Sequence, residues 1–221
     1  MTNLFIIGTD TGIGKTHVTG LLLAELRRLG IRAAAMKPIA CGRDGRRDAE
    51  TYAALMNHEQ PLDILNPVYL RHPLAPSVAA KLEKKQISLA AIRTSYRLLA
   101  AEYSIVLVEG AGGLLVPIQR NFFVADLARD LALPVLVVGR LGLGTINHTL
   151  LTVRQTQATG LKVAGIILND TVGGRRGLAE RTNIAEMPAL CGVPLLGVVP
   201  YGKRGALQAA EQILAHFLAN R

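Results

Sequence analysis

Short apolar runs alternate along the chain with longer segments of helical periodicity. Buried strands are predicted at 4–7, 31–36, 105–108, 134–138, 163–168 and 194–199. Helices are predicted at 15–29, 48–57, 76–101, 122–131, 144–158, 177–190 and about 205–219. Strands that alternate with helices are typical of a parallel sheet covered on both faces. We therefore expect an α/β fold with a doubly wound, mainly parallel sheet, in one domain over residues 1–221.

The composition indicates a folded protein that works in a reducing compartment. Half of the 221 residues are hydrophobic and only 19% are charged, so a sizeable core can form. No apolar run reaches the roughly 18 residues that span a bilayer, and the first residues lack the basic region of a signal peptide. Cys41 and Cys191 have no partners at metal-ligand spacing, which predicts free thiols and a cytoplasmic protein.

The net charge of +9 could indicate a nucleic acid or an anionic membrane surface as partner. Its basic residues form short scattered groups, and aromatic residues make up only 4% of the chain. A site for a polyanionic nucleotide uses part of this charge, so we expect neither a nucleic acid nor a membrane as partner.

A glycine-rich turn between the first strand and the first helix predicts a phosphate-binding loop. The sequence Gly-Thr-Asp-Thr-Gly-Ile-Gly-Lys-Thr occupies residues 8–16. Its glycines let successive backbone N–H groups face an anion, and the following helix presents its positive end to the same phosphates. Lys15 would reach the β and γ phosphates, and the Thr16 hydroxyl would ligate Mg²⁺. Five residues separate Gly8 from Gly14, one more than in the common motif.

Glu109 is the first candidate for an acidic partner of the metal. It closes the most apolar strand, where the carboxyl ends of parallel strands line a ligand crevice. A carboxylate there is costly to bury unless it meets a cation. The alternative is a carboxylate that is satisfied locally at a strand end.

Asp48 and Lys37 are further candidates with open alternatives. Asp48 opens a predicted helix, so it could equally be an N-cap, and Asp44 is a rival metal-side acid four residues earlier. Lys37 ends the second strand on the ligand side and could stabilise charge on a transferred phosphoryl group. Its alternative is a solvated strand-end lysine.

Read together, these segments resemble dethiobiotin synthetases, the ATP-dependent carboxylases that close the ureido ring in biotin synthesis. The resemblance covers almost the whole chain. It is carried by the stretches at 8–16, Lys-Pro-Ile-Ala-Cys-Gly at 37–42, Val-Glu-Gly-Ala-Gly-Gly at 108–113, 143–148, Asn-Asp at 169–170 and Leu-Leu-Gly-Val-Val-Pro at 195–200.

The resemblance implies a role for each of these segments, with ATP as co-substrate and Mg²⁺ as cofactor. Lys15 and Lys37 would be the catalytic cations, and Thr16, Asp48 and Glu109 would ligate Mg²⁺. Asn169 would hydrogen-bond adenine. The implied nucleotide-binding set is Gly12, Ile13, Gly14, Lys15, Thr16, His17, Asp48, Glu109, Gly110, Ala111, Gly112, Asn169, Asp170, Pro200, Tyr201 and Gly202.

The resemblance also implies where the second substrate binds. Thr11 and Cys41 would contact it within the chain, although the family usually has serine where this chain has Cys41. Gly144 and Asn147, at a helix start, resemble the segment that receives the substrate carboxylate from the neighbouring subunit, which implies a homodimer with shared active sites.

The implied reaction carboxylates 7,8-diaminononanoate with CO₂, phosphorylates the carbamate with ATP, and closes the ring to give dethiobiotin, ADP and phosphate.

One alternative is a dimeric switch ATPase of the septum-site and plasmid-partition type. Those proteins carry a signature lysine in the loop at the position where this chain has Asp10. Another is an amide-forming ligase of the same fold, but such enzymes usually carry a glutaminase domain, for which this chain has no length.

Overall fold

A six-stranded parallel sheet forms the centre of the molecule. The computed structural model describes residues 3–202 and 205–219, with the backbone alone for 216–219. The strand order is β10-β9-β8-β1-β5-β2, and each pair of neighbours is parallel. The strands are β1 (Leu4–Gly8), β2 (Ala33–Met36), β5 (Ile105–Gly113), β8 (Val135–Arg140), β9 (Val163–Asn169) and β10 (Leu195–Val199). The apolar runs of β1, β2, β5, β8 and β9 are almost completely buried, as expected of strands covered on both faces, whereas β10 at one edge is only partly buried.

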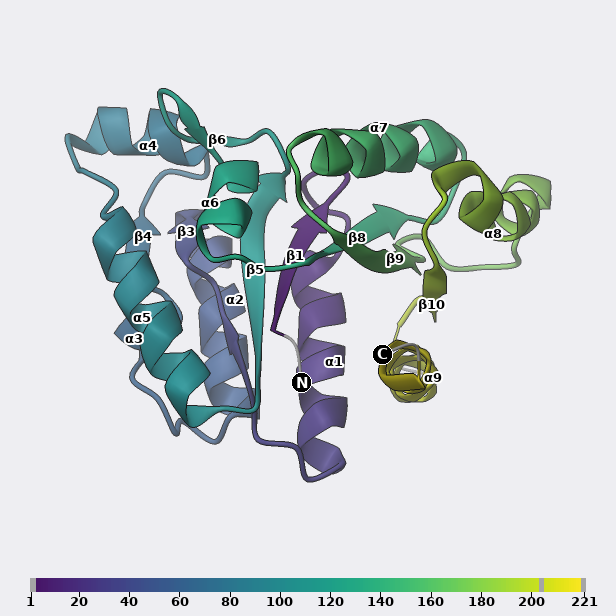
Figure 1. Ribbon diagram of the computed structural model, residues 1–221, viewed down its shortest axis with the longest axis horizontal. Coiled ribbons are helices and arrows are strands. Elements are labelled where there is room, and N and C mark those ends of the chain that lie inside the picture. The colour runs from purple at the N-terminus through teal and green to yellow at the C-terminus, as the bar shows by residue number, and fades with distance from the viewer. Residues whose placement is uncertain (1–2, 203–204, 220–221) are drawn as a thin grey trace.

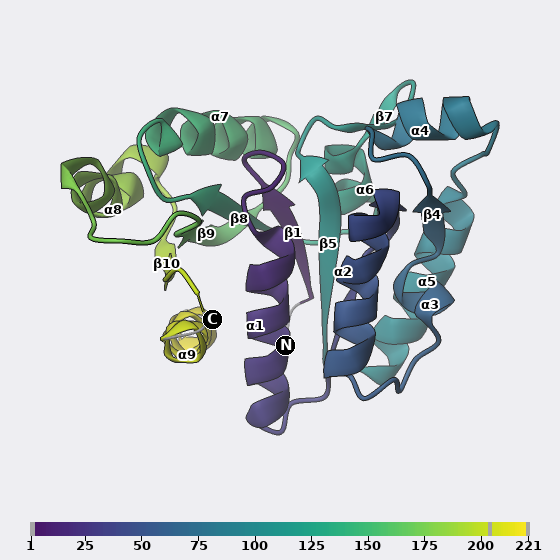
Figure 2. The same ribbon diagram turned by 180° about the vertical axis from the view of Figure 1, so that it is seen from behind.

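Helices cover both faces of this sheet. On the face seen in Figure 2 lie α1 (Lys15–Arg28), α2 (Gly42–Leu55) and α9 (Ala206–Ala219). On the opposite face, seen in Figure 1, lie α5 (Leu89–Glu102), α6 (Val124–Asp130), α7 (Thr145–Ala158) and α8 (Leu178–Cys191). The doubly wound, parallel α/β fold predicted from the sequence is therefore confirmed.

Shorter elements cluster around the carboxyl ends of β5 and β2. A parallel pair joins β3 (Ile39–Cys41) to β4 (Val68–Leu70), and an antiparallel pair joins β6 (Pro117–Gln119) to β7 (Phe122–Phe123). The short helix α3 (Leu62–Leu65) precedes β4, and α4 (Pro76–Glu83) lies beside β6 at the top of Figure 1. These elements add a wall above one half of the sheet.

Two helix predictions were wrong in their bounds. The helix predicted at 48–57 begins at Gly42, because tertiary contacts outweigh the low helix propensity of Gly42 and Gly45. The cap of α2 is Cys41, so the interpretation of Asp48 as an N-cap is also wrong. The single helix predicted at 76–101 is two helices, because the chain leaves α4 through the left-handed residue Lys84.

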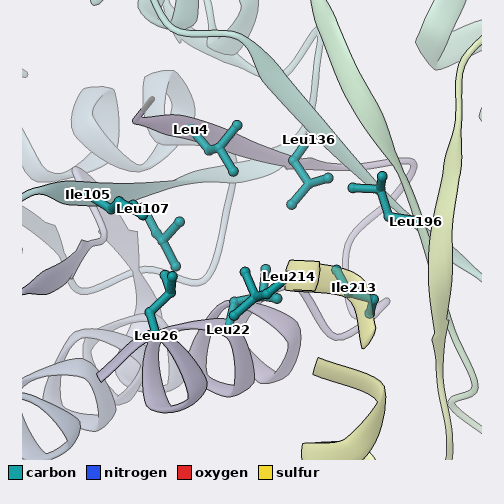
Figure 3. A pocket seen from close by; sticks show the side chains of 9 residues that line it. All are labelled: Leu4, Leu22, Leu26, Ile105, Leu107, Leu136, Leu196, Ile213 and Leu214. Atoms are coloured by element: carbon teal, nitrogen blue, oxygen red, sulfur yellow. The ribbon is translucent and has the colours of Figure 1, made fainter. Parts of the chain in front are cut away.

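A small apolar cavity lies between α1, α9 and the sheet (Figure 3). Nine aliphatic side chains line it, and its volume is about 10 Å³. A gap of this size lined only by aliphatic groups is a packing defect of the core.

The helices in the described part of the chain include none with the length and apolar character of a membrane span.

Candidate active site

The loop between β1 and α1 forms a cradle of backbone amides. Gly12 and Gly14 adopt left-handed conformations, with φ of 72° and 89°, and Gly14 caps α1. A Cβ atom at Gly14 would lie 2.1 Å from Nδ2 of Asn169, so only glycine fits. This geometry turns N–H groups toward the site and places the positive end of α1 behind them.

Lys15 is held beside this cradle. Its side chain is buried, and Nζ donates a hydrogen bond of 3.1 Å to the carbonyl oxygen of Asp10. Burial lowers the pKa of Lys15 to about 8, despite the opposing charge of Glu109. An anion bound in the cradle would favour the charged ammonium, as a phosphate-binding lysine requires.

Four predicted residues meet in one hydrogen-bonded cluster around Glu109, which lies within β5 and does not close it, because the strand predicted at 105–108 continues to Gly113. Oε1 of Glu109 accepts from the Thr16 hydroxyl at 3.0 Å and from Nζ of Lys37 at 2.6 Å. The same Lys37 ammonium donates to Oδ2 of Asp48 at 2.8 Å. Asp44, the rival acid, is 93% exposed and pairs with Arg47 instead. The geometry therefore places Asp48, and not Asp44, with the buried acid.

The positive charge of Lys37 lies in contact with the two carboxylates of Glu109 and Asp48. Burial opposes the charge on Lys37, but Glu109 and Asp48 outweigh it and raise the pKa of Lys37 above its usual value. Burial raises the pKa of Asp48, although Lys37 opposes the shift. Lys37 is thus a cation kept charged at the carboxyl edge of the sheet, and its alternative as a solvated strand-end lysine is wrong.

Tyr52 belongs to the same cluster, and the sequence interpretation missed it. Its fully buried hydroxyl donates a hydrogen bond to Oε2 of Glu109. Tyr52 lies four residues after Asp48, so both point from the same face of α2. Both residues fall within the helix predicted at 48–57, so this spacing was a signal that could have identified the tyrosine.

A cleft of about 790 Å³ opens beside the cradle and the cluster. One wall is the phosphate loop with Ala111 and Gly112, and the opposite wall is the segment 73–76 with Cys41. Thr11 also lines the cleft. Burial raises the pKa of Cys41 to about 11, so the group facing the cleft is a neutral thiol.

The predicted base-side residues lie at the ends of β9 and β10. Nδ2 of Asn169 donates to the Ile13 carbonyl at 2.9 Å, while its Oδ1 is buried with no hydrogen-bond partner in the described structure. Asp170 shapes the turn after β9 by accepting from the backbone of Val172 and Gly173. The ring of Tyr201 packs over this turn, where Gly173 leaves it room.

The remaining predicted residues divide between the two sides of the phosphate loop. His17 is exposed near the start of α1, and Gly110 is buried on β5 below the cleft. Gly144 and Asn147 are exposed at the start of α7, outside the cleft. A separate pocket of about 140 Å³ adjoins them, lined by the outer side of the phosphate loop and by Thr145 and His148. The chain does not bring the start of α7 into its own cleft.

The donors in the cluster suit a magnesium ion. Thr16, Asp48 and Glu109 offer oxygen atoms, the donor class that Mg²⁺ prefers, and Glu109 is only 1% exposed. Among residues 3–202 and 205–219, no group of three His, Cys, Asp or Glu side chains forms a ready-made metal site. A site of one or two carboxylates is what Mg²⁺ uses when substrate phosphates complete its ligands.

Comparisons with known proteins point to one activity. A family model described as an AAA domain matches residues 2–205. The chain is 51% identical over 171 residues to the ATP-dependent dethiobiotin synthetase BioD of an Anaeromyxobacter species, covering 76% of this chain and 77% of that protein. It is 44% identical over 203 residues to the protein of the same name from Anaeromyxobacter dehalogenans, covering 91% of each. A Bacillus licheniformis protein of that name is 39% identical over 90% of this chain and 86% of its own length.

Solved structures share the fold at low sequence identity. The MinD protein in a MinC:MinD cell division complex of Aquifex aeolicus superposes with a TM-score of 0.62 at 13% identity, covering 99% of this chain and 96% of that chain. The cell division ATPase MinD of Pyrococcus furiosus gives a TM-score of 0.61 at 14% identity over the full length of both. Identity at this level shows a common P-loop fold and nothing further.

Proposed function

Because the chain belongs to the family of ATP-dependent dethiobiotin synthetases, and is therefore an ATP-dependent ligase of biotin biosynthesis, we propose that it carboxylates 7,8-diaminononanoate and closes the ureido ring. The observation that carries this proposal is the meeting of Thr16, Lys37, Asp48 and Glu109 at one end of the cleft, beside the phosphate loop. A phosphoryl group can be held and transferred there.

The first part of the proposal concerns the triphosphate of ATP. The amides of Gly12 to Thr16 bind its phosphates, with His17 at the edge of the cradle, and Lys15 places a positive charge against the β and γ groups. Thr16, Asp48 and Glu109 would hold Mg²⁺. When bound, this ion neutralises charge on the β and γ phosphates. Gly110, Ala111 and Gly112 carry little or no side-chain bulk, so the backbone after Glu109 can lie close to the nucleotide.

The base of ATP is assigned to the ends of β9 and β10. The buried Oδ1 of Asn169 is an acceptor without a partner in the described part of the chain, and the amino group of adenine is a donor. Asp170 supports the turn on which this contact depends, and Pro200, Tyr201 and Gly202 flank the base. Loss of the Asn169 amide should weaken ATP binding.

The reaction proceeds in three steps between groups of the substrates. An amino group of 7,8-diaminononanoate adds to CO₂ to form a carbamate, with loss of a proton. The carbamate oxygen takes the γ-phosphoryl group, which gives a mixed carbamic–phosphoric anhydride and ADP. The second amine attacks the carbonyl carbon and expels phosphate, which closes the ring of dethiobiotin. The protein positions these groups and balances their charge, so no protein nucleophile is needed.

Lys37 is assigned to the reacting centre in this scheme. Its ammonium lies at the carboxyl edge of the sheet and lines the cleft, where it can stabilise charge on the carbamate and the moving phosphoryl group. Thr11 and Cys41 line the same cleft and would contact the diamine. A thiol is a weaker donor than the usual serine hydroxyl, so Cys41 would hold the substrate less firmly.

The substrate carboxylate is assigned to a second subunit. Gly144 and Asn147 lie at the start of α7, where a helix N-terminus attracts anions, yet they do not line the cleft of their own chain. A cytoplasmic homodimer in which each α7 serves the partner's cleft would combine the two sites.

The test is product analysis together with phosphate release. Incubation with ATP, Mg²⁺, bicarbonate and 7,8-diaminononanoate should give the mass of dethiobiotin, and the diamine with bicarbonate should stimulate phosphate release. Release stimulated by DNA or liposomes instead would favour the switch ATPase. Unchanged turnover in Lys37→Ala would remove the role assigned to that lysine.

A further inference from the structure

The hydroxyl of Tyr52 is placed to control the orientation of Glu109. Tyr52 is fully buried on α2, one helical turn after Asp48. Its hydroxyl donates to Oε2 of Glu109, the oxygen that Thr16 and Lys37 do not use. The two oxygens of the buried carboxylate therefore face different groups.

This division fixes the rotation of the carboxylate. Oε1 takes two donors, one from α1 and one from the end of β2, whereas Oε2 takes a donor from α2. A carboxylate that is 1% exposed has little access to water as a substitute donor. Without the Tyr52 hydroxyl, Oε2 would have no hydrogen-bond partner in the described structure, and the carboxylate would turn to share the remaining donors.

We propose that Tyr52 is a positioning residue for metal binding, which holds Glu109 so that Oε1 and the Thr16 hydroxyl face the same ion. The inference rests on the proposed function through the assignment of Thr16, Asp48 and Glu109 to Mg²⁺. Tyr52 and Asp48 share one face of α2, so a single helix carries one proposed ligand and orients another. Residues that orient metal ligands in this way typically change metal affinity or activity by about 10–100-fold when removed.

The chain contains a matched control for this tyrosine. Tyr103, which is 4% exposed, donates from its hydroxyl to Oε2 of Glu59 at 3.0 Å, at the opposite end of the sheet from the cleft. Tyr103→Phe and Tyr52→Phe each remove one hydroxyl and one hydrogen bond to a glutamate. A purely structural role would make the two variants alike in everything except melting temperature.

The experiment measures ADP binding by calorimetry, once with Mg²⁺ and once with EDTA. The ratio of the two dissociation constants reports metal binding without turnover. We expect Tyr52→Phe to reduce the Mg²⁺-dependent gain by about 10-fold or more, while its ADP affinity in EDTA stays within about twofold of wild type. Tyr103→Phe should keep the wild-type ratio.

A second variant covers the case in which Tyr52→Phe does not fold. Tyr52→Met fills the site with a flexible apolar side chain that has no hydrogen-bond donor. It should show the same reduced Mg²⁺-dependent gain in ADP affinity as Tyr52→Phe. A folded variant of either kind that keeps the wild-type ratio would overturn the inference alone. No effect of Mg²⁺ on ADP binding in the wild type would overturn the inference and the proposed metal ligands together.

Discussion

Replacing Lys37 by methionine should destabilise the protein in the absence of nucleotide. The ammonium of Lys37 is 2.6 Å from Glu109 and 2.8 Å from Asp48, and its side chain is 8% exposed. Methionine fills similar space but carries no charge, so the variant leaves two carboxylates next to each other with no cation between them. We expect the free energy of unfolding to fall.

The magnitude follows from the two distances and the burial. At an effective dielectric constant of about 20, each contact is worth roughly 6 kcal/mol of Coulomb attraction, most of which offsets the cost of burying the charges. Removing one partner of a buried pair costs about 3–5 kcal/mol. Tyr52 and Thr16 still donate to Glu109, which favours the lower figure. A loss of about 3 kcal/mol should lower the melting temperature by about 6–12 °C in a chain of this size.

Thermal unfolding followed by circular dichroism in EDTA and in Mg²⁺ would check this reasoning. Mg²⁺ should stabilise Lys37→Met more than the wild type, because the ion replaces a missing positive charge in the variant. The control is Lys162→Met, which removes an exposed lysine away from the cleft. A melting temperature for Lys37→Met within about 2 °C of wild type in EDTA would refute the stabilising role of the Lys37 ion pairs. Equal gains from Mg²⁺ in both proteins would refute the proposed position of the metal.

Two further predictions concern the walls of the cleft. Gly14→Ala should lower ADP affinity by at least about 10-fold in a binding titration, because its Cβ would meet Asn169 at 2.1 Å. The control is Gly160→Ala, whose Cβ would be strained at φ 79° but would have no atom within 4 Å. This variant should lose about 1–2 kcal/mol of stability and keep the wild-type affinity for ADP. Glu83→Gln should raise the KM of the proposed diamine substrate more than that of ATP, because Glu83 anchors His72 next to the 73–76 wall. Equal changes in both constants would contradict this. Burial opposes the charge of Glu83, but hydrogen bonds led by those from His72 outweigh it and lower the pKa of Glu83 to about 2. The stability that Glu83 contributes is therefore present above about pH 4.5 and lost as the pH falls toward 2, so acid should narrow the difference in melting temperature between wild type and Glu83→Gln.

The sheet and the phosphate loop could be predicted because local patterns determine them. The apolar runs of the parallel strands have no other stable environment than a covered sheet, and Gly14-Lys15-Thr16 stands at the junction of a strand and a helix. Glu109 could be predicted because a carboxylate that follows the most apolar run of the chain needs a cation, although the strand itself continues to Gly113. Lys37 supplies that cation in the structure.

The remaining parts depend on contacts between segments far apart in the sequence. The start of α2 at Gly42 is stabilised by close packing against Pro73, which no local pattern reveals. The choice between Asp44 and Asp48 depended on that helix, because its register decides which acid faces Lys37. Tyr52 was missed although it lies in the predicted helix, because a buried tyrosine resembles any core residue until its hydrogen-bond partner, Glu109, is known.

The β3–β4 pair forms a small annex that is separate from the six-stranded sheet and supports one wall of the cleft. Its hydrogen bonds are separate from those of the six-stranded sheet, and its strands lead into Cys41 on one side and toward the 73–76 segment on the other. β3 joins Lys37 directly to α2, so changes of length there would displace Asp48 and Tyr52, whereas β4 leads to the 73–76 wall without carrying any residue of the cluster. Redesign of the cleft for another acceptor should therefore begin at β4 and leave Pro73, which packs against the start of α2, in place.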